Sequence, residues 1–200
     1  MVNPDYQDAI DYAISQLKEK LPTDLIYHSV DHTECDILPA VERLAGISQV
    51  VGDDLQLLRV GAAYHDIGFI YRYQGHELAS ARMAAQILPD FGFTDELIER
   101  ILGMIMATRL PQSPRNPLEE LLVDADLDIL GRNDFFKGSL RLRFELALYG
   151  RPTNEKQWYQ EQLNFLKEHF YFSDAAKSIR DAGKQKNTTL MEWLIQKDGQ

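Results

Sequence analysis

Hydrophobic positions recur at helical spacing along the whole chain. The first stretch, "NPDYQDAIDYAISQLKEKL", places apolar residues on one helix face at Ile10, Ala13, Ile14 and Leu17. The same spacing of three and four residues returns throughout the sequence. We find no strong alternating pattern of the kind that a half-buried strand shows. We therefore expect an all-α fold.

Helix boundaries can be placed from capping residues, glycines and prolines. Further helices are expected over "HSVDHTECDILPAVERLA", "DDLQLLRVGAAYHD", "GHELASARMAAQIL", "TDELIERILGMIMATR" and "LEELLVDADLDIL", and over residues 134–149, 154–171 and 173–197. Pro39 should bend or divide the second helix. The stretch "LPQSPRNP" should form a loop, either as the rim or lid of a site or as a stiff connector.

Length and composition limit the domain organisation and the environment of the protein. Two hundred residues without a Gly/Ser linker suit one domain over 1–200, with a C-terminal helical extension from about residue 132. The formal net charge of -10 disfavours binding to nucleic acid.

Cys35 stands alone, and the N-terminus lacks a signal-peptide pattern. No apolar run approaches the roughly 20 residues that span a bilayer. We expect a cytoplasmic protein without a membrane partner.

The histidines are concentrated in one part of the chain. Four of the five lie between residues 28 and 76. His28 and His32 are four residues apart, which suits two ligands of one ion, one ligand beside an acid–base group, or two partly exposed histidines at a helix start. His65 has apolar or small helical neighbours and should face inward. Asp66 follows it, and two adjacent inward polar groups are costly unless a partner, such as a cation, satisfies both.

A further carboxylate ligand is expected in "LLVDADLDIL". Asp126 lies in the middle of the apolar face of this stretch. Asp124 and Asp128 fall on the opposite side, where we expect them to be solvated. A buried carboxylate without a partner costs several kcal/mol. We therefore expect His32, His65, Asp66 and Asp126 to surround one divalent ion.

These residues, in this order, resemble a known family. The set "H…HD…D" in a helical chain, from about residue 24 to about 131, resembles the HD-domain superfamily of metal-dependent phosphohydrolases. The segment "DADLDILG" is similar to one in nucleotide-cleaving members, whose second Asp binds metal; here that residue is Asp126. "YHSVDH" resembles the opening motif of cyclic-nucleotide phosphodiesterases. This resemblance implies that His28 protonates the leaving oxygen and that His32 binds the metal.

The chain departs from the two- and three-metal members of the family. His76 is similar in position to the first of their additional histidines. The next would fall near "MATR", where this chain has Thr108 and Arg109. A complete second metal site is therefore not expected. We interpret His76 and Glu77 as pocket residues that contact the metal ligands or partly form a second site. The alternative is a histidine at a helix start with an acidic first turn.

Ligand chemistry and the resemblance together predict the reaction. Mixed imidazole and carboxylate ligands suit Mn, Fe, Co, Ni or Zn, and Mg less well. Asp66, or alternatively Asp126, would orient the attacking water, and His28 would act as the acid. Arg109 would contact the phosphate, unless it only complements the dipole of its helix end.

The expected function is hydrolysis of a small-molecule phosphate ester, with nucleotides among the candidate substrates. The alternatives are a cyclic-nucleotide-type phosphodiesterase, a non-catalytic metal- or ligand-binding regulatory protein, and a two-iron oxygenase. The aromatic-rich stretch "EKQWYQEQLNFLKEHFYF" should pack on the domain. A homodimer face is the alternative for that stretch.

Overall fold

The computed structural model describes residues 4–197, which form helices and loops without any β-strand. The expected all-α fold is confirmed. The α-helices are α1 (Tyr6–Lys20), α2 (Leu38–Ile47), α3 (Gly52–Tyr64), α4 (His76–Ile87), α5 (Asp95–Ala107), α6 (Pro117–Asp126), α7 (Phe135–Leu148), α8 (Glu155–Glu168) and α9 (Asp174–Lys197). Short helical turns are η1 (His32–Ile37), η2 (Ile67–Ile70), η3 (Leu88–Phe91) and η4 (Asp128–Gly131). Within the described range, no helix is long and apolar enough to cross a membrane.

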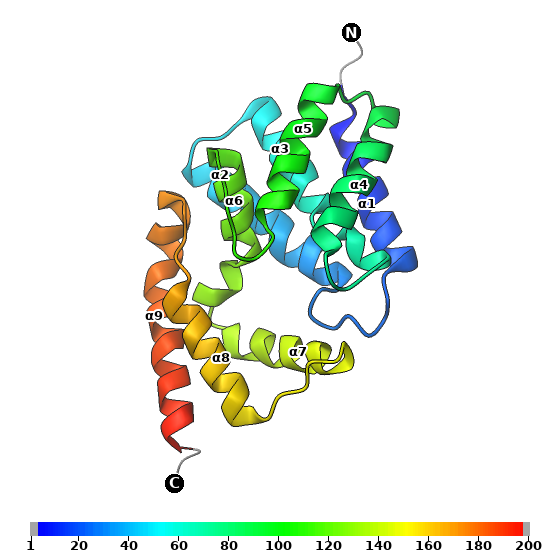
Figure 1. The fold of residues 1–200 in the computed structure, drawn as a ribbon. Helices are drawn as coiled ribbons and strands as arrows, with labels where there is room; N and C mark the ends of the chain where they lie inside the picture. Colours follow the sequence, from blue (N-terminus) through cyan, green and yellow to red (C-terminus); the bar gives the residue numbers. More distant parts are fainter. Residues whose placement is uncertain (1–3, 198–200) are drawn as a thin grey trace.

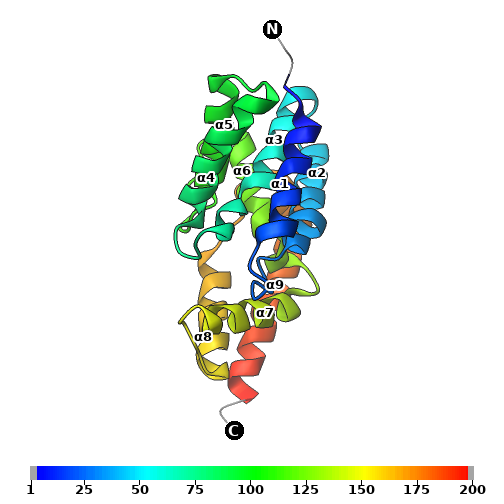
Figure 2. The ribbon, with the colours of Figure 1, turned by 90° about the vertical axis from the view of Figure 1, so that its right-hand side faces the viewer.

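The helices form two groups. Helices α1 to α6 stand side by side as a bundle, and α7 lies across its lower end (Figure 1). Helices α8 and α9 pack against each other, and α9 also packs on η4, directly after α6. Figure 2 shows that this second group extends the molecule beyond the bundle. The C-terminal helices are therefore in position to cover the end of α6.

The second expected helix is not regular along its length. Residues His32–Ile37 form a π-helical turn, in which the backbone N–H of Leu38 donates to the carbonyl of Thr33. Regular α-helix begins at Leu38, so Pro39 lies in the first turn of α2. A proline is tolerated there because its missing N–H has no helical partner to lose. His28 precedes the helix altogether, so it does not share a helix face with His32.

The expectation that Asp124 and Asp128 face solvent is wrong. Asp124 is completely buried and Asp128 is 3% exposed. The Asp124 carboxylate accepts hydrogen bonds from the backbone N–H groups of Phe172 and Ser173 and from the Ser173 hydroxyl. Asp128 binds Arg180 of α9 through both carboxylate oxygens. Local sequence pattern does not reveal the partners of these two acids, because the partners lie about fifty residues further along the chain.

Asp124 should contribute strongly to stability. Asp124→Ala leaves the buried N–H groups of Phe172 and Ser173 without a partner, so we expect the free energy of unfolding to fall by about 3 kcal/mol. Urea denaturation measures this change. Asp181→Ala, at an exposed position of α9, is the control and should change stability by less than about 0.5 kcal/mol. Equal effects of the two substitutions would contradict the anchoring role.

Candidate metal centre

Four side chains from separate parts of the chain meet in the bundle. The Nε2 atom of His65 lies 3.2 Å from Oδ2 of Asp66 and 3.6 Å from Oδ1 of Asp126. The Nε2 atom of His32 lies 3.7 Å and 3.6 Å from the same two oxygens. The ligand atoms of His32, His65 and Asp66 lie within 4.8 Å of one another. The four residues expected to hold an ion are thus brought together.

Three of the converging atoms are buried without any hydrogen-bond partner among the described residues. They are Nε2 of His32, Nε2 of His65 and Oδ2 of Asp66. The other ring nitrogen of His65 is fixed, because Nδ1 lies 2.7 Å from the carbonyl oxygen of Ala62. A backbone contact of this kind orients a histidine ligand toward a metal. Buried polar atoms normally have partners, and a divalent cation would satisfy all three at once. The donor set therefore fits a metal ion.

The electrostatics of the cluster favour a positive charge at its centre. Burial alone would raise the pKa of Asp126, but its contacts with His32 and His65 lower that pKa to about 2. Burial would lower the pKa of His65, but the neighbouring Asp66 and Asp126 carboxylates raise it well above its usual value. The carboxylates remain ionised at neutral pH. Their field attracts either protons on the imidazoles or a cation between them.

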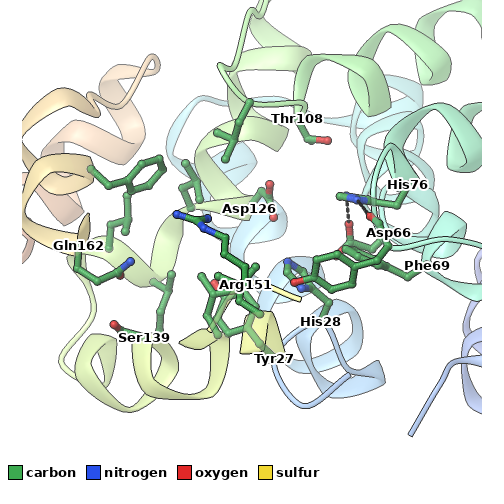
Figure 3. Close-up of a pocket in the computed structure, with 18 of the residues that line it drawn as sticks. Tyr27, His28, Asp66, Phe69, His76, Thr108, Asp126, Ser139, Arg151 and Gln162 are labelled. Carbon is green, nitrogen blue, oxygen red and sulfur yellow. Dashed lines mark hydrogen bonds and ion pairs between the residues drawn. The ribbon is translucent and has the colours of Figure 1, made fainter. Parts of the chain in front are cut away.

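His76 approaches the cluster from the opposite side of Asp66. Its Nε2 atom lies 3.3 Å from Oδ1 of Asp66, and its ring stacks on Phe69 with the ring centroids 3.8 Å apart (Figure 3). Gly68 permits this approach, because a side chain there would collide with the backbone of His76 and Ser80. Glu77 also lines the cavity beside His76. Both residues lie at the site, as expected, with His76 touching the second oxygen of a candidate ligand.

His28 is held by a carboxylate that the sequence analysis missed. Its Nδ1 atom lies 2.5 Å from Oε1 of Glu145, which is completely buried in α7. The same carboxylate accepts bonds from the backbone N–H groups of Tyr27 and His28 and from the Tyr73 hydroxyl. Because an ionised carboxylate only accepts, Nδ1 of His28 must carry a proton. No described residue hydrogen-bonds to Nε2, which remains for a molecule in the cavity.

Glu145 stays ionised although it is buried. Burial alone would raise its pKa, but the bonds from the His28 ring and the two N–H groups hold that pKa below its usual value. The signal that could have found Glu145 is weak. Leu142 and Tyr149 place it on an apolar side of α7, but apolar residues also occupy exposed sides of this helix, at Phe144 and Leu148.

A cavity of about 490 Å³ adjoins the cluster. Its wall includes His28, Asp66, His76 and Asp126. Of the tyrosines near the motifs, Tyr27 and Tyr73 line this cavity, whereas Tyr64 is buried and Tyr71 is exposed. A concave space beside several titratable groups is the usual form of a small-molecule site.

Arg109 is not brought to this site. Its side chain is exposed and lines a different cavity, beside Arg115 and Glu119. Its neighbours Thr108 and Leu110 line the cavity beside the metal cluster, whereas Arg109 lines the other cavity. Arg151, in the loop between α7 and α8, lines the cavity instead (Figure 3). The loop after α7 supplies the positive charge that the "ATRLP" stretch was expected to supply.

Comparison with known proteins supports the motif interpretation. Residues 38–129 match the family model of the HD domain, a range that contains His65, Asp66 and Asp126. A crystal structure of a structural-genomics target from Lactobacillus plantarum is similar, with a TM-score of 0.70 and 17% sequence identity. The similarity covers 100% of this chain and 97% of that one, and at this identity it shows a shared fold. No curated protein matched the chain. The resemblance of the motifs to the HD domain is thus confirmed over residues 38–129.

Proposed function

We propose that the protein is a metal-dependent hydrolase of phosphate esters. The observation that carries this proposal is the set of three buried ligand atoms, from His32, His65 and Asp66, that have no partner among the described residues. The match of residues 38–129 to the HD domain supports it. The adjoining cavity gives a small molecule access to Asp66 and Asp126.

Each residue of the site has a defined task in this proposal. His32, His65, Asp66 and Asp126 would hold the cation. A bound divalent cation supplies Lewis acidity, which activates water and polarises the phosphoryl group. Asp66 orients the attacking water through its carboxylate. His28 gives the proton on Nε2 to the leaving oxygen, while Glu145 fixes the ring through Nδ1.

The ligand types narrow the choice of metal. Two imidazoles and two carboxylates suit Mn, Fe, Co, Ni or Zn better than Mg, which prefers oxygen ligands and retains water. A nearby His76 could serve a second ion only partly, because Thr108 and Arg109 stand where a further histidine would be needed. We propose one well-formed metal site.

The direct test combines metal analysis with turnover. Protein purified without added metal is stripped with chelator and reloaded separately with each of the five candidate ions. Release of inorganic phosphate is then measured over a panel of phosphomonoesters and nucleotides, and conversion of cyclic nucleotides to nucleoside monophosphates is followed by chromatography. We expect turnover only in a reloaded sample. Turnover in the stripped sample would overturn the proposal, and tight metal binding without any turnover would favour the regulatory alternative.

Arg151 should bind the phosphate group of the substrate. Within the described chain it is the one lysine or arginine that lines the cavity. Its partner is Glu161, at 2.7 Å, and a pair this exposed contributes little to stability. The guanidinium can therefore exchange Glu161 for a phosphate. We expect Arg151→Ala to raise KM by about tenfold with little change in kcat. Arg109→Ala is the matched control and should change neither constant; the reverse pattern would contradict the assignment.

A further inference from the structure

The cavity beside the metal cluster continues into a second compartment with a different lining. The far compartment is walled by Leu130, Phe135, Leu142, Leu146, Trp158 and Phe165. Figure 3 shows Ser139 and Gln162 at this end, opposite His76 and Asp66. One cavity thus joins a polar, metal-binding end to an apolar end.

The polar groups in the far compartment are mostly engaged with one another. The Ser139 hydroxyl accepts a hydrogen bond from the Trp158 ring N–H at 2.9 Å. Arg151 and Glu161 are 60% and 38% exposed, so this pair lies toward solvent, where Arg151 is free to exchange Glu161 for a phosphate. Gln162 alone among the polar residues of this wall has no hydrogen-bond partner in residues 4–197. A nucleobase needs several donors and acceptors around its edge, and its binding site would leave them free. The lining matches a hydrophobic group instead.

The size of the cavity also exceeds what the reaction centre needs. A volume of about 490 Å³ is far more than one phosphoryl group fills, since liquid water takes about 30 Å³ per molecule. Apolar walls around empty or water-filled space are costly, and an apolar ligand group that displaces this water gains free energy.

We infer that the far compartment binds a hydrophobic alkyl or aryl leaving group, so that the substrate is a phosphate monoester of a hydrophobic alcohol. The inference rests on the proposed function, because the phosphate end of such a molecule would lie at the metal cluster. The turn η4 and the helices α7 and α8 supply the compartment. Most of its wall lies after residue 129, outside the range that matches the HD domain. Substrate choice is thus set by helices added to the HD core.

The test uses a series of n-alkyl phosphates from methyl to octyl with the manganese-loaded protein. The intrinsic reactivity of these esters is nearly constant beyond ethyl, so differences in kcat/KM report how well the protein binds the alkyl chain of the substrate. We expect kcat/KM to rise about fourfold for each buried methylene until the compartment is filled. A flat series, or a nucleoside monophosphate preferred over octyl phosphate, would overturn the inference.

Two variants of α7 test whether the increase of kcat/KM with alkyl chain length arises in this compartment. Leu142 is half-buried and lines the compartment, whereas Leu148 is 64% exposed on the same helix and does not. Leu142→Gln should lower kcat/KM for octyl phosphate about tenfold and leave methyl phosphate unchanged. Leu148→Gln should change neither substrate. If Leu142→Gln lowers kcat/KM for both substrates equally, or for neither, the compartment does not bind the alkyl chain.

A binding measurement separates this inference from the proposed function. Alkylphosphonates carry the same chain and a similar charge but have no ester bond to hydrolyse. Calorimetric titration of the manganese-loaded protein should show affinity that increases with chain length. If that increase is found while no ester is turned over, the hydrophobic site stands and the hydrolase proposal fails. If affinity is independent of chain length, the inference itself fails.

Discussion

Asp66→Asn is expected to lower kcat/KM for phosphate release by about a thousandfold and to reduce the metal content of the purified protein. Asp66 has the most central position in the cluster. One carboxylate oxygen lies 3.2 Å from Nε2 of His65 and 3.7 Å from Nε2 of His32, and the other lies 3.3 Å from Nε2 of His76. The amide has nearly the same shape as the carboxylate, but it lacks the negative charge that attracts a cation.

Metal analysis by mass spectrometry and phosphate release together measure this effect. Asp124→Asn is the matched control, because Asp124 is buried like Asp66 and lies on the same helix as Asp126, but it binds backbone N–H groups of the C-terminal segment. We expect the control to lower stability while the folded protein keeps its metal and its turnover. A protein with Asn at position 66 that retains both metal and turnover would remove Asp66 from the centre of the mechanism.

His28→Ala is expected to reduce kcat for alkyl phosphates by about 10²- to 10⁴-fold without loss of bound metal. His28 lines the cavity, but its ring nitrogen Nδ1 binds Glu145 rather than the metal cluster. A poor leaving group such as an alkoxide needs the proton that His28 supplies. The nitrophenolate released from p-nitrophenyl phosphate is stable without that proton. The loss should therefore be much smaller for p-nitrophenyl phosphate.

Glu145→Gln tests whether the carboxylate acts through His28. The amide can still accept a bond from Nδ1, but it no longer stabilises the charged imidazolium. We expect the same dependence on leaving group as in His28→Ala. The alkaline limb of kcat against pH should also move to lower pH, because the acid on His28 loses its proton more readily without the Glu145 charge. A uniform loss for both leaving groups would indicate that Glu145 only maintains the fold. In that case Glu145 is not a positioning residue for the acid.

The local pattern of apolar residues and capping residues was sufficient to predict most of the helices. Helix periodicity and caps such as Thr94 and Asn154 placed the helices close to their observed limits. Within "DADLD", the apolar neighbours of Asp126 distinguished the carboxylate that faces the metal cluster from the two that flank it. The cost of burying a charge did not separate these acids, because Asp124 and Asp128 are more deeply buried than Asp126. The apolar neighbours of Asp126 were the useful signal, because they lie close to it along the chain.

Contacts between distant segments could not be predicted in the same way. Glu145 meets His28 across 117 positions of the chain, and Asp128 meets Arg180 across 52. A carboxylate on a mixed helix such as α7 gives no sign of its partner. The positions of Arg109 and Arg151 depend on where two loops pass over the cavity. Such placement follows from tertiary packing, which the spacing of apolar residues does not encode.

The alternate acids of "DADLD" have a thermodynamic consequence. Asp126 points to the metal cluster. Two residues before it, Asp124 binds the segment that leads into α9, and two residues after it, Asp128 binds α9 itself. The position of one ligand is therefore tied to the docking of the last helix. Two processes that share one native conformation are linked, so that each favours the other. Capture of a cation near the middle of the molecule thus also tightens the hold on its C-terminal arm.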